Sequence, residues 1–118
     1  MASFENSIIG LACWNAAKGE PHTAMLSVAM VFRNRANAGW YEKDVYMNAT
    51  HWLLENPPDF PDTRDPQFQL LLSKLDAVVA GEVQDRTGGA LDFVKKQDAT
   101  EQIAGQIVMT ISNMLFIR

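Results

Sequence analysis

Residues 14–21 read WNAAKGEP, and this short stretch decides how the chain folds. Before it, residues 3–17 carry an apolar stripe at helical spacing, with Ser3 as a suitable N-cap. Gly19 is typical of a helix stop, and Pro21 suits the first turn of a second helix. The stretch therefore predicts a tight turn between two helices. The stripe of the first helix consists of Phe4, Ile8, Leu11 and Ala12.

The second helix follows from the same periodicity. It is expected to begin at Pro21 and to stop at Gly39. Its apolar stripe consists of Met25, Val28, Ala29 and Phe32, with Val31 beside it. Residues 41–54 are less regular, and they predict either a short helix or an ordered loop.

Residues 55–66 read ENPPDFPDTRDP, and four prolines exclude a helix interior there. We expect a surface loop, because the stretch is too short to link two domains. Asp65 and Pro66 predict a helix start, as N-cap and first helical residue, and Gly81 ends that helix. Its apolar face consists of Phe68, Leu71, Leu72, Leu75, Val78 and Val79.

The last third of the chain changes from helical to alternating patterns. Residues 90–94 alternate like a short strand, and so do Ile107, Met109 and Ile111. Met114 and Phe116 alternate as well, so two or three antiparallel strands are expected. Helices first and a small C-terminal antiparallel β element predict an α+β fold, mainly helical, as a single domain over residues 1–118.

Composition narrows the class of protein. A chain of 118 residues with 47% hydrophobic residues supports one core and excludes intrinsic disorder, and a single cysteine excludes a disulfide scaffold. A net charge of −4 disfavours nucleic acid as a partner. His22 and His51 are isolated, and phosphate-loop and dinucleotide motifs are absent, so neither metal nor cofactor is expected.

The ends and apolar runs predict where the chain is made. No apolar run approaches the ~18–20 residues of a membrane-spanning helix, so stable membrane insertion is not expected. No basic residue precedes the first apolar stretch, as it does in a signal peptide. We therefore expect synthesis in a cytoplasm. Action outside that compartment would need another route of delivery.

Three segments carry polar residues that could perform chemistry, and each also has an ordinary structural explanation. Glu20 lies just ahead of a helix, where an acid complements the helix dipole. Asn34 and Arg35 could hydrogen-bond a sugar, but a basic residue also favours a helix C-terminus. Residues 85–93, DRTGGALDF, bring backbone close to a neighbour or form a plain turn before a strand. Three tryptophans could stack on sugars or be partly buried, namely Trp14, Trp40 and Trp52.

Taken in order, these segments resemble the cell-wall hydrolase family of the bacterial spore cortex-lytic enzymes (the SleB/CwlJ type), which also occurs in phages. The family motif, aromatic-x-Glu-Ala-Arg-Gly-Glu, is similar to residues 14–20. A following helix that ends in Asn-Arg is similar to residues 26–35, LSVAMVFRNR. An Asp-x-Thr-x-Gly-Ala-Leu-aromatic run is similar to residues 85–93, and a closing strand to residues 110–118. The resemblance spans about residues 8 to 118.

The resemblance implies cleavage of the glycan strand of peptidoglycan, by a lytic transglycosylase or muramidase route, on a lysozyme-like α+β fold. In the family the first Glu of the motif is the catalytic acid/base, and here Ala16 holds that position. Glycosidic cleavage needs a carboxylic acid to protonate the leaving oxygen, and alanine has no proton to give. Removing a general acid typically costs ~10²–10⁴-fold in rate.

The resemblance also implies roles for other residues. Glu20 orients the loop or supports the acid, Trp14 presses against the acid and raises its pKa, and Phe93 packs beside the sugar. The residues expected to contact or line the glycan cleft are Trp14, Asn34, Arg35, Thr87, Gly88, Gly89 and Phe93.

Three explanations of Ala16 are open at this point. The chain is an engineered inactive variant of a parent with glutamate, a natural non-catalytic relative that still binds glycan, or a protein in which Glu20 has become the acid. Two functions follow. The first is a glycan-strand hydrolase, either a phage lysin released by a holin or a virion-associated enzyme carried in the virion. The second is a non-catalytic module. That module would bind peptidoglycan or act as a structural or regulatory virion component.

Overall fold

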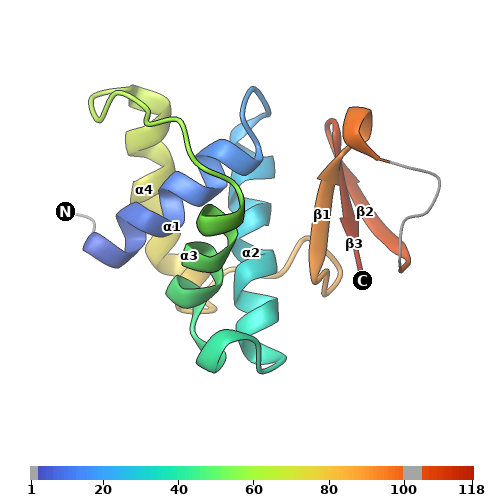
Figure 1. Ribbon diagram of the computed structural model, residues 1–118. Helices are drawn as coiled ribbons and strands as arrows, with labels where there is room; N and C mark the ends of the chain where they lie inside the picture. Colours follow the sequence, from blue (N-terminus) through green and yellow to red (C-terminus); the bar gives the residue numbers. More distant parts are fainter. Residues whose placement is uncertain (1–2, 100–104) are drawn as a thin grey trace.

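In the computed structural model of the chain, four helices pack together and a three-stranded sheet lies beside one of them, α2 (Figure 1). The structure describes residues 3–99 and 105–118. The helices are α1 (Phe4–Ala16), α2 (His22–Asn37), α3 (Val45–Glu55) and α4 (Pro66–Val79), with short 3-10 turns η1 (Tyr41–Lys43) and η2 (Lys96–Asp98). The strands are β1 (Asp92–Lys95), β2 (Ile107–Ile111) and β3 (Met114–Ile117). The α+β class expected from the sequence is confirmed.

The helix ends lie where the capping residues predict them. The Ser3 side chain accepts a hydrogen bond from the backbone N–H of Asn6 at 3.1 Å, which fixes the start of α1. Asp65 caps α4 in the same way, accepting from Gln67 N–H at 2.8 Å. Gly19 has φ +81°, a conformation that side chains disfavour, so the turn between α1 and α2 depends on glycine there. The open choice for residues 41–54 resolves into η1 followed by α3.

One predicted core residue is wrong: Phe4 is 72% exposed. Helix α1 contacts α2, α3 and α4 at once, so its inward face is the one that all three can reach. Leu11 and Ala12 of the predicted stripe are buried, whereas the exposed Phe4 ring packs edge-to-face on Tyr46 of α3, with ring centroids 6.4 Å apart. The buried residues of this face are Ile9, Ala12, Cys13 and Ala16.

The sheet has the strand order β1-β3-β2, and both pairs are antiparallel. Strand β1 starts at Asp92 rather than at residue 90, because Asn34 binds the Ala90 carbonyl while Leu91 N–H donates to Ile117 O. A β-bulge between Ile107 and Met109 interrupts the predicted alternation of β2 and leaves both side chains exposed.

The core lies between the four helices and continues into β3. Met114 and Phe116 of that strand are fully buried together with α2 residues such as Phe32. Burial of these side chains attaches the sheet to the helices. In the described ranges no helix is both long and apolar enough to cross a bilayer.

Candidate functional site

A polar cleft of about 490 Å³ lies where the ends of α1 and α3 face β1 and η2. Its walls combine amide groups, two lysines, one aspartate and two aromatic rings, a mixture that suits sugar hydroxyls and ring faces. The lining residues are Asn15, Ala16, Lys18, Trp52, Asn56, Pro57, Phe93, Val94, Lys95, Gln97 and Asp98.

Ala16, the position at which the sequence motif predicts an acid/base, lies in the wall of this cleft and is 8% exposed. It is the last residue of α1, and the backbone leaves the helix at Ala17, whose N–H still bonds Cys13 O at 3.1 Å. The methyl group offers no proton. Among the residues described, Asp98 is the one carboxylate that lines the cleft, and it belongs to η2.

Asn15 and Lys18 hold the rim of the cleft in place. The Asn15 amide forms two hydrogen bonds with the backbone of Asp59, donating to its carbonyl at 2.9 Å and accepting from its N–H at 2.8 Å. Lys18 Nζ lies 2.8 Å from Asp59 Oδ2, and this hydrogen bond and charge lower the pKa of the exposed Asp59 carboxyl. The proline-containing loop is thereby attached to the end of α1.

Aromatic rings form one side of the cleft. The Phe93 ring lies 6.2 Å from that of Trp52 and 6.1 Å from that of Phe32, which is buried beneath it. Phe93 and Trp52 are half-buried, so part of each ring faces the cleft. The structure thus places Phe93 in the same cleft as Ala16, while its contact with a sugar stays a prediction.

Glu20 does not line the cleft. Its Oε1 accepts a hydrogen bond from the backbone N–H of Asn113 at 3.0 Å, in the turn between β2 and β3. That turn has a residue in the left-handed region, Ser112 with φ +54°, and Glu20 supports it. The observed role is therefore attachment of the hairpin to the α1–α2 turn.

The structure does not bring Asn34, Thr87 and Gly89 to the cleft either, because all three hold the loop before β1 through Asp85. Asn34 Nδ2 donates to Asp85 at 3.0 Å, and the fully buried Thr87 donates its hydroxyl at 2.6 Å. Gly89 N–H adds a third bond at 2.9 Å. Gly88 and Gly89 both have positive φ, so this loop conformation needs glycine.

Trp14 and Arg35 do not line the cleft, but the Arg35 guanidinium lies 5.8 Å from the ring centroid of the cleft residue Phe93. Trp14 packs edge-to-face on Phe68, with ring centroids 5.6 Å apart. Arg35 donates to Leu91 O at 2.6 Å and to Asp92 at 3.2 Å, and its guanidinium lies 4.8 Å from the Trp40 ring centroid. Arg35 thus holds the start of β1. Of the predicted site residues, the structure brings Ala16 and Phe93 together.

The cleft residues that sequence reasoning missed are chiefly Asn15, Asn56, Lys95 and Asp98. They lie in three separate segments, and none has a spacing or motif that links it to the others. Trp52 was one of three equivalent tryptophans in the sequence. Its position at the end of α3 singles it out.

We expect Asp85→Asn to destabilise the fold by about 2 kcal/mol at neutral pH, because charge-assisted hydrogen bonds would be lost. Burial alone would raise the pKa of Asp85, but the bonds from Thr87, Asn34 and Gly89 outweigh it and lower that pKa. The stabilisation is therefore complete above about pH 4 and declines as the pH falls through the lowered pKa.

Urea unfolding at pH 7 and at about pH 3, followed by tryptophan fluorescence, measures this effect. The difference in the free energy of unfolding between the wild-type chain and Asp85→Asn should be smaller at the lower pH. Asp62→Asn is a matched control, because Asp62 lies on the surface and pairs with its neighbour Arg64. A difference that does not change with pH would contradict the stabilising role of the ionised Asp85 carboxylate.

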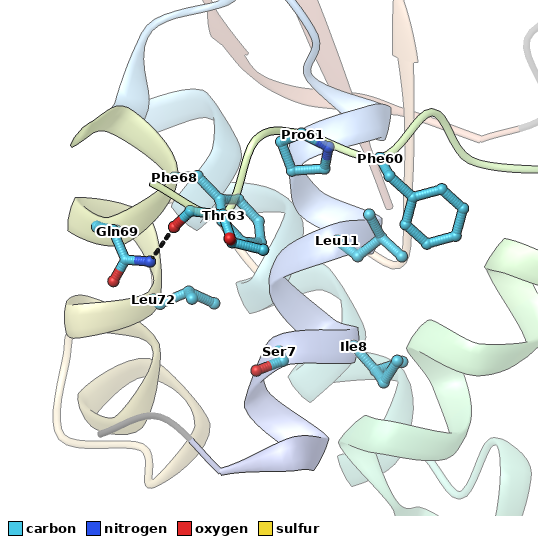
Figure 2. A pocket seen from close by; sticks show the side chains of 9 residues that line it. All are labelled: Ser7, Ile8, Leu11, Phe60, Pro61, Thr63, Phe68, Gln69 and Leu72. Atoms are coloured by element: carbon cyan, nitrogen blue, oxygen red, sulfur yellow. Dashed lines mark hydrogen bonds between the residues drawn. The ribbon is translucent and has the colours of Figure 1, made fainter. Parts of the chain in front are cut away.

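A second pocket, of about 480 Å³, lies between α1, α4 and the loop that joins α3 to α4 (Figure 2). Figure 2 shows Ile8 and Leu11 on α1, Phe60 and Pro61 on the loop, and Phe68 and Leu72 on α4, so the walls are mainly apolar. The Gln69 amide donates to the carbonyl of Thr63 within it. With few free polar groups, this pocket does not match the hydrogen-bonding needs of a sugar chain.

His51 and Cys13 have structural surroundings rather than those of a reactive site. His51 stacks on Tyr41 with ring centroids 3.8 Å apart, and Cys13 is fully buried, which raises its thiol pKa. Within residues 3–99 and 105–118, no three His, Cys, Asp or Glu side chains converge as metal ligands.

The chain was compared with protein-family models, curated proteins and solved structures. No protein-family model and no curated protein matches the chain. Among solved structures, the catalytic domain of the Bacillus cereus SleB protein matches with a TM-score of 0.71 at 17% identity, covering 100% of this chain and 93% of that one. The chain has the SleB catalytic-domain fold. The catalytic domain of the germination-specific lytic transglycosylase SleB from Bacillus anthracis matches with a TM-score of 0.65 at 20% identity, covering 98% of this chain and 96% of that one.

The SleB-like fold is the one that the sequence motifs implied. The agreement concerns the fold, since fewer than a quarter of the residues are identical. The small sheet and the four helices cover nearly the whole length of both SleB domains.

Proposed function

We propose that this chain is a peptidoglycan-lytic domain of the lytic transglycosylase or muramidase kind, present in a form that lacks its acid/base. The observation that carries the proposal is the position of Ala16. The motif places the acid at this residue, which is buried at the edge of the hydrophobic core and also lines the polar cleft. Two SleB catalytic domains with the same fold support the substrate class.

The cleft residues would bind the glycan through ring stacking and hydrogen bonds. The Trp52 and Phe93 rings offer faces for sugar rings, and the exposed Asn56 amide offers a donor and an acceptor for hydroxyl and acetamido groups. In a transglycosylase one carboxyl group protonates the leaving oxygen and then deprotonates the sugar's own hydroxyl. A single side chain at position 16 would therefore complete the chemistry.

A second candidate function is a non-catalytic module that binds peptidoglycan, with or without a structural or regulatory role in a virion. Two observations favour it: Ala16 has no proton to give, and Glu20 is bonded to Asn113 instead of pointing into the cleft. These observations also weigh against Glu20 as a replacement acid. Whether Ala16 is engineered or natural does not change the binding that both candidates share.

Sedimentation with insoluble peptidoglycan tests the shared part of the proposal. The wild-type chain should sediment, and Trp52→Ala should bind less because it removes a cleft ring. Phe60→Ala is the control, since Phe60 lies at the apolar pocket and is largely exposed. A wild-type chain that stays in the supernatant would count against both candidates.

Release of soluble glycan fragments from the same samples separates the candidates. Little or no release is expected from the wild-type chain. Release that Glu20→Gln abolishes, in a variant that still folds, would instead identify Glu20 as the acid.

The wider setting belongs to the same proposal. The domain would be made in a cytoplasm and would act at the bacterial cell wall, as a phage lysin released by a holin or as a virion-associated protein. The support is the sequence resemblance to a family that includes phage members. No part of the proposal involves nucleic acid.

A further inference from the structure

A third pocket, of about 350 Å³, lies between α2 and α4, and the proposed function makes no use of it. Its buried lining is mainly apolar: Met30 and Val78 are each 2% exposed, and Leu26 lies half-buried beside them. Its exposed lining is polar and includes Lys74 and Arg86. The pocket therefore has an apolar interior below a polar opening, and it shares no lining residue with the polar cleft.

The opening of this pocket has a positive charge. The charged side chains that line it, among the residues described, are Lys74 and Arg86, and both are basic. His22 lines it as the first residue of α2, so the partial positive charge of that helix end adds to theirs. The first turn of α2 contains no acid, and its N-cap Pro21 makes no side-chain hydrogen bond. In a chain with a net charge of −4, this local concentration of positive charge favours an anionic ligand.

His22 has a polar atom that the fold leaves without a partner. Its Nε2 is buried and forms no hydrogen bond with the residues described. Most buried polar atoms in native proteins are satisfied, so an exception beside a pocket points to a group from outside the chain. The hydroxyls of Ser27 and Ser73 in the same pocket already donate to helix carbonyls, each at 2.7 Å. The imidazole and the two cationic side chains are thus the chief groups left to bind a ligand.

The electrostatics of His22 agree with this geometry. Burial of the ring, together with the charge of Lys74, lowers the pKa of His22 from its usual value of 6.5. Lys74 and Arg86 are the charged groups that line the pocket with it, and neither favours a protonated ring. An anion bound among these three side chains would reverse that balance, since it would give the protonated imidazole an opposite charge.

We propose that this pocket binds a small amphiphilic anion, with one anionic head group such as a carboxylate on a short apolar body. Arg86 would bind the head group through parallel N–H donors and Lys74 through its compact charge. The apolar body would lie against Leu26 and Met30. A volume of about 350 Å³ is near the lower end of the roughly 300–1,000 Å³ of small-molecule sites, so it suits a small molecule rather than a polymer.

Proton NMR of the two histidine rings of the full chain tests the proposal with octanoate as the probe. Octanamide keeps the apolar chain without the charge, and acetate keeps the charge without the chain. Octanoate should shift the His22 signals saturably and raise the pKa of His22. His51, which stacks on Tyr41 outside the pocket, should not respond and is the internal control. Octanamide and acetate should each bind about tenfold more weakly, because each lacks one of the two interactions.

Variants of the cationic residues test which side chains bind the head group. Lys74→Gln and Arg86→Gln should each weaken octanoate binding by about tenfold and leave octanamide binding unchanged. Lys74→Gln should also raise the pKa of His22 in the free chain, because one cause of its lowering is removed. Lys96→Gln is the matched control, since Lys96 is exposed, lies outside the pocket and carries the same charge. Lys74→Arg should restore most of the affinity.

Three results would overturn the proposal. The first is the absence of a saturable His22 shift with octanoate, and the second is equal affinity for octanoate and octanamide. The third is an equal loss in Lys74→Gln and Lys96→Gln, because the net charge of the chain would then explain binding. Melting temperatures measured on the same samples show that each variant is folded. The proposal is independent of peptidoglycan binding, which the sedimentation experiment tests at the other site.

Discussion

Ala16→Glu is expected to raise glycan-strand cleavage by about 10²–10⁴-fold over the unaltered chain. The substitution places a carboxyl group in the wall of the cleft, at the position where the sequence motif has its acid/base. Ala16 lines a cleft of about 490 Å³, and the prediction requires the longer side chain to extend into it. Release of soluble fragments from purified peptidoglycan measures the gain.

The matched control is Ala16→Gln, which has nearly the same shape as the glutamate variant but cannot donate a carboxylic proton. It should remain as inactive as the wild-type chain. A folded Ala16→Glu chain that binds peptidoglycan and releases nothing would contradict the lytic proposal and favour the non-catalytic module.

The pH profile of the glutamate variant carries further information. Lys95 lines the same cleft, and its positive charge favours the ionised form of a carboxylate at position 16. Removing that charge raises the pKa of the carboxyl, so more of it stays protonated as the pH rises. Ala16→Glu combined with Lys95→Gln should therefore keep its activity to a higher pH than Ala16→Glu alone.

Phe116→Ala is expected to destabilise the fold by ~3–5 kcal/mol, the usual cost of emptying a buried phenylalanine site. Phe116 is 0% exposed, and as part of β3 it attaches the sheet to the helical core. A loss of this size is a large fraction of the stability of a small domain, about 5–15 kcal/mol. Urea unfolding by tryptophan fluorescence and circular dichroism measures it.

Phe60→Ala serves as the control for this prediction. Phe60 is 80% exposed, so its removal should move the unfolding midpoint very little. Because the cleft lies between helices and sheet, Phe116→Ala should also weaken peptidoglycan binding at temperatures where the chain is still folded. Similar midpoints for the two variants would contradict the role of β3 in attaching the sheet.

Much of the helical architecture could be predicted because its signals are local. The Ser3 and Asp65 caps and the Gly19 turn act through backbone groups within a few residues. The face that a helix buries is not set by local signals, because it depends on which elements pack around the helix. Phe4 was predicted to be buried and is exposed. Strand β1 was placed two residues early for a similar reason, since Asn34 of α2 binds the backbone before it.

The candidate site was also predictable only in part. The motif identifies Ala16 from sequence, and the structure places it in a cleft with Phe93. Asn34 and Thr87 also belong to motifs, but a motif does not say whether its residues touch a ligand or hold a loop. Their bonds with Asp85 show that they hold the loop before β1.

By itself the sequence determined the α+β class and the helix ends. Both depend on neighbouring residues or on residues one helical turn apart, whereas Ala16 was singled out by the resemblance to a family motif. Only the tertiary structure decided that Lys95 reaches the Lys18 carbonyl and that Glu20 reaches Asn113. These contacts join residues 77 and 93 positions apart, and no local preference of the backbone encodes which segments will meet.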